Sequence, residues 1–135
     1  MAVFQPFTSD GQIETILAKF TDCTLPRSSW THGAHFAASL SLLAIHPRDQ
    51  VERDLPHLIR AYNKATGLPN TDLKGYHETI TQASLRAAAS FLAANPPHPL
   101  FATCNKLMRS DLGRAEWLLQ YWSRSRLFTT EARRA

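Results

Sequence analysis

Several features that would mark a membrane-spanning or secreted protein are missing from this chain of 135 residues. No apolar run approaches the length that crosses a bilayer, and the start lacks a basic segment followed by an apolar one. Only two cysteines are present, Cys23 and Cys104, and their wide separation favours buried free thiols over a disulfide. These absences predict a cytoplasmic protein that does not associate with a membrane.

The motifs of several enzyme classes are absent as well. The chain has no GxGxxG or GxxxxGK(S/T) phosphate loop, no HExxH zinc motif and no GxSxG nucleophile elbow. The paired Glu-x-x-His motifs of helical di-iron proteins are also missing. The sequence therefore gives no support to these common forms of phosphate, peptide, ester or di-iron chemistry.

The composition is that of an ordinary globular protein, with 44% hydrophobic and 19% charged residues, and it predicts one domain over residues 1–135. The formal net charge is +4. Much of the basic charge lies near the C-terminus, in Lys106, Arg109, Arg114, Arg124, Arg126, Arg133 and Arg134. A solvated helix face is the commoner reason for such a collection, and no nucleic-acid recognition motif accompanies it. We therefore do not expect nucleic acid as a partner.

Hydrophobic residues recur at helical spacing nearly throughout, and no segment alternates as a strand would. The pattern predicts an all-α fold, a compact bundle of about five to six helices. The expected helices begin at Asp10, at Ser29 or Thr31, at Arg48, at Tyr76, at Pro99 and at Ser110 or Asp111, and the last runs through Trp122. Pro56 falls inside the third helix, which must kink or restart there.

Histidines gather at two expected helix entrances, Trp30–Phe36 and Gly75–Thr81. His32 and His35 are spaced i, i+3 and so share one helix face, and the partial positive charge of a helix start favours the neutral imidazole that a metal needs. His77, brought in from the other entrance, would complete a three-nitrogen site for a divalent metal ion. Zinc and iron suit such a site because imidazole binds both.

Two classes of function are compatible with these residues. In a metal-dependent enzyme, Glu78 would handle a proton beside a bound water, and Tyr62 or Arg124 would contact a small anionic or polar substrate. In a non-catalytic helical module that binds a small molecule or a protein partner, the same histidines would form a buried polar network. The chain would act as a monomer or homodimer in either class. The remaining histidines, His46, His57 and His98, are expected to be surface or capping residues.

Several segments also carry a resemblance: Trp30–Phe36, Tyr62-Asn63, Pro69-Asn70-Thr71, Gly75–Thr81 and Tyr121–Phe128. Together they resemble an uncharacterised family of small bacterial helical proteins with THxxH, NT…GYHETIT and YxSRxxLF segments. The similarity covers the chain from Trp30 onward, and GYHETIT is its most specific part. The resemblance groups these segments without implying a mechanism, and it implies that relatives continue beyond Ala135.

Overall fold

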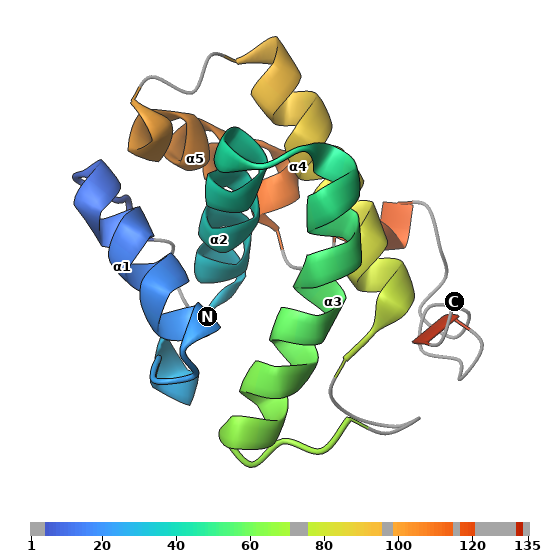
Figure 1. Ribbon diagram of the computed structural model, residues 1–135. Coiled ribbons are helices and arrows are strands. Elements are labelled where there is room, and N and C mark those ends of the chain that lie inside the picture. The colour runs from blue at the N-terminus through green and yellow to red at the C-terminus, as the bar shows by residue number, and fades with distance from the viewer. Residues whose placement is uncertain (1–4, 71–75, 96–98, 115–116, 121–131, 134–135) are drawn as a thin grey trace.

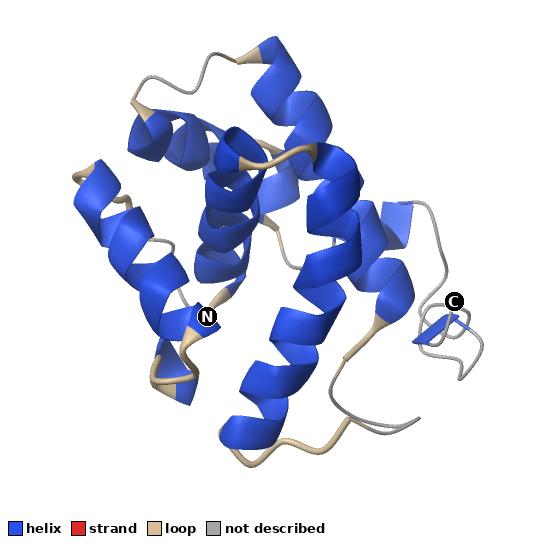
Figure 2. Cartoon of the chain, viewed as in Figure 1, coloured by secondary structure: helices blue, strands red, loops and turns tan. Residues whose placement is uncertain are grey.

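The computed structural model describes residues 5–70, 76–95, 99–114, 117–120 and 132–133. These residues form helices, turns and loops and contain no strand, which confirms the predicted all-α fold (Figure 2). The α-helices are α1 (Asp10–Thr21), α2 (His32–Ile45), α3 (Arg48–Ala65), α4 (Glu78–Ala94) and α5 (Leu100–Arg109). Among the described helices, none has both the length and the apolar character that a bilayer span requires.

Helix α2 lies at the centre of the bundle and packs against the other four helices (Figure 1). Of the two predicted caps, Thr31 is the one used, because its hydroxyl accepts the backbone N–H of Ala34 at 3.1 Å. Small buried residues such as Ala37 and Ala38 let neighbouring helices approach closely. The helix ends at Ile45, and His46 follows it as the C-cap, because the residue before a proline, here Pro47, is disfavoured in the helical conformation.

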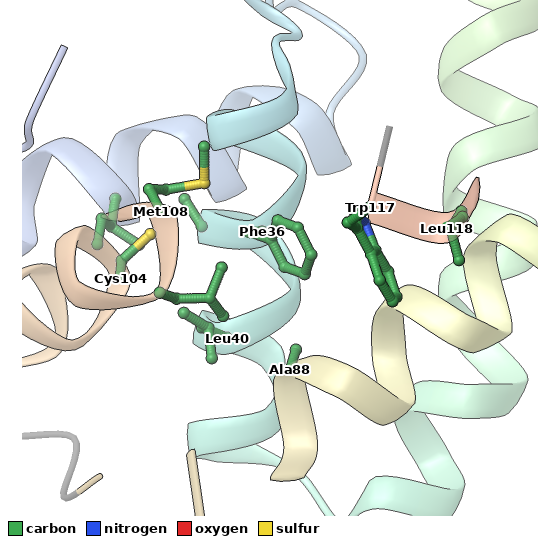
Figure 3. Close-up of a cluster of buried hydrophobic side chains, with 10 residues drawn as sticks. Phe36, Leu40, Ala88, Cys104, Met108, Trp117 and Leu118 are labelled. Atoms are coloured by element: carbon green, nitrogen blue, oxygen red, sulfur yellow. The ribbon is translucent and has the colours of Figure 1, made fainter. Parts of the chain in front are cut away.

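The core divides into two clusters that share α2. One joins α2 to α1, α4, α5 and the segment at Trp117 and Leu118, and Figure 3 shows Phe36 extending from α2 toward Trp117. The other joins α2 to α1 and α3 through large side chains, among them Phe20, Leu25, Val51, Leu55 and Tyr62. Because both faces of α2 are covered, its N-terminal and C-terminal ends are the parts that reach the surface.

Pro56 lies inside α3, and the helix continues across it rather than restarting. A proline has no N–H, so the carbonyl four residues earlier, that of Glu52, loses its helical partner. The side chain of Gln82 in α4 replaces it, with its Nε2–H 3.5 Å from the Glu52 carbonyl oxygen. The proline thus opens a hydrogen-bonding position on α3 that helps to attach α4.

The predicted sixth helix is wrong for the part of it that the structure describes. Asp111–Gly113 and Trp117–Gln120 are short 3-10 helices, and residues 121–122 lie outside the described part. The reason is a tight turn after α5, where a Cβ on Gly113 would sit 1.8 Å from the Met108 carbonyl oxygen. Helix α4 also starts two residues later than predicted, because His77 is its cap.

Candidate functional site

His32 opens α2 and is held by the loop that follows α5. Its Nε2–H donates a hydrogen bond of 2.8 Å to the carbonyl oxygen of Leu112, and its ring meets Phe36 edge-on with centroids 5.0 Å apart. A carbonyl oxygen can only accept, so the proton of neutral His32 is on Nε2. The imidazole therefore joins the start of α2 to the 3-10 turn at Asp111–Gly113.

His35 lies one turn further along α2 and belongs to an aromatic cluster. Its ring is 5.2 Å from that of Trp30, which in turn stacks on Phe20 with centroids 4.3 Å apart. Burial, together with the nearby His32, lowers the pKa of His35 to about 4. His35 is consequently neutral near pH 7, which is the protonation state that the sequence pattern predicts.

His77 is the N-cap of α4 and is 6% exposed. Its Nδ1 accepts the backbone N–H of Ile80 at 3.2 Å, which satisfies one of the free donors at the helix start. Because Nδ1 is the acceptor, a neutral His77 carries its proton on Nε2 and has no second lone pair. A metal ion could bind His77 only at the expense of this cap or this proton.

Glu78, the predicted proton carrier, has both carboxylate oxygens bound by neighbours. The Tyr76 hydroxyl donates to Oε2 at 2.5 Å, and the Gln82 amide donates to Oε1 at 3.0 Å. The Arg60 guanidinium lies 4.2 Å from the centre of the Tyr76 ring. Burial, and then the Glu78 carboxylate, raise the pKa of the Tyr76 phenol. This cluster ties α3 to the start of α4, and each oxygen of Glu78 accepts one internal hydrogen bond.

Tyr62, predicted to contact substrate, lies wholly in the core. Its hydroxyl donates to the carbonyl oxygen of Leu25 at 2.9 Å. The adjacent Asn63 accepts a hydrogen bond of 2.7 Å from Arg27 and donates one to the side chain of Asn70 at 3.1 Å. These contacts fasten the loop after α1 and the loop after α3 to the end of α3.

The predicted three-histidine centre is not assembled. No group of three His, Cys, Asp or Glu side chains among the described residues, which include His32, His35 and His77, is placed to hold a metal ion. His32 and His77 instead bind main-chain atoms, which fixes where their ring protons are. Zinc or iron as a bound ion stays a prediction from the sequence. Arg124 lies outside the described residues.

Both cysteines are free thiols, as predicted. Cys104 is fully buried in the core, and burial raises the pKa of its thiol to about 12. The thiolate is the reactive form of cysteine, so burial disfavours the reactive form of this residue.

A cleft lies where α2 ends and α3 begins, at the opposite end of α2 from His32. It has a volume of about 330 Å³ and is lined by Leu42, His46, Gln50, Val51, Asp54, His57 and Leu58. The 14 residues of α2 span about 20 Å, so the cleft is separated by roughly this distance from His32. In Figure 1 the turn between α2 and α3 lies in the upper half of the molecule, below the end of α4, and the start of α2 is lower down. We call this feature the α2–α3 cleft.

The polar residues of the α2–α3 cleft differ from those of the helix entrances in having uncommitted side chains. No hydrogen bond or ion pair joins the side chain of His46, Gln50, Asp54 or His57 to another residue in the described part of the chain. Leu42, Val51 and Leu58 provide apolar surface beside them. The arrangement, a concave apolar surface with a few available polar groups, is typical of small-molecule sites.

His46 and His57 are exposed, as the sequence predicts, but the sequence does not predict that they line the same cleft. One wall of the cleft could have been predicted from the sequence, because Gln50, Asp54 and His57 are spaced i, i+4, i+7 and so lie on one face of α3. The opposite wall, which comes from the end of α2, is set by the turn at His46-Pro47. No spacing rule gives the angle of that turn.

No family model, curated protein or solved structure matches the chain. The family resemblance of its segments stays a prediction.

Proposed function

We propose that this protein is a non-catalytic helical module that binds a small molecule in the α2–α3 cleft. The observation that carries the proposal is the division between two sets of polar side chains. At the helix entrances, the polar groups have internal partners: His32 binds the loop after α5, and His77 and Glu78 accept hydrogen bonds at the start of α4. Around the cleft, the polar groups are available. Ligand recognition needs donors and acceptors that the protein itself has not used.

The dimensions of the cleft favour a ligand of modest size. Ligand pockets are commonly about 300–1,000 Å³, and the α2–α3 cleft is at the lower end of that range with about 330 Å³. One ring with a short polar substituent would cover Leu42 and Leu58 and still reach the polar rim. Ile45, next to the cleft residue His46, is 67% exposed and extends the apolar surface at the end of α2.

The metal-dependent enzyme class receives no comparable support. The Nδ1 of His77 would have to give up the cap of α4 before it could bind a metal ion, and both oxygens of Glu78 already accept one internal hydrogen bond each. A cytoplasmic location, and a monomeric or homodimeric state, stay predictions from the sequence.

Binding can be tested by following backbone amide signals in two-dimensional NMR while benzyl alcohol, a neutral ring with one hydroxyl, is added. We expect concentration-dependent shifts confined to residues 42–58, with a dissociation constant on the order of millimolar for so small a probe. Gln50→Trp, which places an indole in the cleft, should abolish these shifts. Lys64→Trp, at an exposed position of the same helix, is the matched control and should leave them intact.

Two results would oppose the proposal. Shifts centred on residues 31–35 and 77–81 would place binding at the helix entrances and favour the enzyme class. An absence of shifts at every position, in a protein that remains folded, would remove the evidence for a small-molecule site.

A further inference from the structure

We infer that the ligand of the α2–α3 cleft is a small monocation that carries an apolar ring, such as an arylalkyl amine or an amidine, and that the Asp54 carboxylate binds its charged group. This inference rests on the proposed function, to which it adds the chemical class of the ligand.

The first support is the local pairing of charges on α3. Two of the nearby carboxylates already have cationic partners, because Glu52 pairs with Arg48 at 2.9 Å and Asp49 pairs with Arg53 at 3.4 Å. Asp54 lines the cleft and has no ion pair within the described part of the chain. The cleft thus keeps one uncompensated negative charge, although the whole chain has a net charge of +4.

The second support is the direction of α2. Helix dipoles place partial negative charge at the C-terminal end, and cations are favoured there. Helix α2 ends beside the cleft, and its last turn has no basic residue to offset that charge. The positive end of α3 is also nearby, and its first turn contains both the basic Arg48 and the acidic Asp49, each already in an ion pair. Both the helix end and the free carboxylate therefore favour a positive ligand.

The third support is the arrangement of the remaining polar groups. His57 is three residues after Asp54 and Gln50 is four residues before it, so all three lie on one face of α3. The imidazoles of His46 and His57 and the amide of Gln50 provide acceptors for the N–H groups that do not reach Asp54. The ring of the ligand would cover the apolar residues of the same cleft.

The test compares three probes of similar shape and different charge: benzylamine, benzyl alcohol and phenylacetate. Their affinities are measured in one buffer near neutral pH by amide shifts of residues 42–58. Because Asp54 is at an exposed rim, we expect a modest preference, with benzylamine binding about three- to five-fold more tightly than benzyl alcohol and phenylacetate binding most weakly. Asp54→Asn should remove the preference, whereas Asp49→Asn, which alters an already paired carboxylate, should retain it.

The outcomes separate this inference from the function on which it rests. Equal binding of all three probes in the cleft would overturn the charge assignment and leave the proposed function standing. A preference for benzylamine that survives Asp54→Asn would overturn the role of Asp54. Failure of every probe to bind would overturn the proposed function itself.

Discussion

Gly113→Ala is expected to lower the free energy of unfolding by about 3 kcal/mol or more, because the added methyl group has no space. An ideal Cβ at this position would lie 1.8 Å from the Met108 carbonyl oxygen and 2.6 Å from its carbonyl carbon. These are main-chain atoms at the end of α5, so no flexible side chain can move aside. The turn would have to open, and with it the Leu112 carbonyl that accepts the hydrogen bond of His32.

Urea unfolding followed by circular dichroism measures this loss, and Gly11→Ala supplies the matched control. A Cβ on Gly11 would meet its nearest neighbour, the Ser9 hydroxyl, at an ordinary 3.6 Å. Alanine is also the better residue inside a helix, so this variant should be unchanged or more stable by up to about 1 kcal/mol. Wild-type stability in Gly113→Ala would show that the turn after α5 is not as tight as described.

Acidification is expected to destabilise the protein through His35. The folded-state pKa of this residue is about 4, below its ordinary value of 6.5, so the unfolded chain takes up the proton first as the pH falls. The contribution of neutral His35 to the free energy of unfolding is therefore fully present above pH 6.5 and declines as the pH falls from 6.5 to about 4. Below about pH 4 the titration of this residue causes no further loss. The full difference corresponds to about 3 kcal/mol, and residual contact of the ring with solvent makes about 1–3 kcal/mol the expected loss.

The measurement is the free energy of unfolding at a series of pH values for the wild type, His35→Gln and His46→Gln. Carboxylates titrate in part of the same range, so the informative quantity is the difference between curves. His35→Gln should flatten the decline between pH 6.5 and 4. His46→Gln removes an exposed histidine and should follow the wild type. Identical slopes in all three proteins would mean that His35 is readily protonated in the folded state.

Local signals in the sequence were sufficient for most of the fold. Thr31 and the His46-Pro47 stop bound α2 because a hydroxyl cap and a proline act on their immediate neighbours. Gly67 follows the C-cap of α3 and has a φ of 84°, a conformation that glycine adopts without strain and that ends a helix. The segment after α5 was less predictable, because its shape depends on the contact between Gly113 and the main chain of Met108.

The candidate site was less predictable than the fold, because it depends on which partner each polar group finds. The spacing of His32 and His35 correctly places them on one face of α2, but it does not reveal that Leu112 accepts the His32 proton. His77 was expected inside the first turn of its helix. It is instead the cap, a role more often filled by Ser, Thr, Asp or Asn.

The histidines at the helix entrances have structural contacts, because His32 donates to the Leu112 carbonyl and His77 caps α4. We therefore expect them to form no metal centre, which can be checked by recording the imidazole nitrogen signals of the tag-free protein by NMR while Zn²⁺ is added. The protons of His32 and His77 should be on Nε2, and the signals of His32, His35 and His77 should be unchanged after one equivalent of zinc. A joint shift of these three rings that saturates at one equivalent would instead establish the three-histidine site.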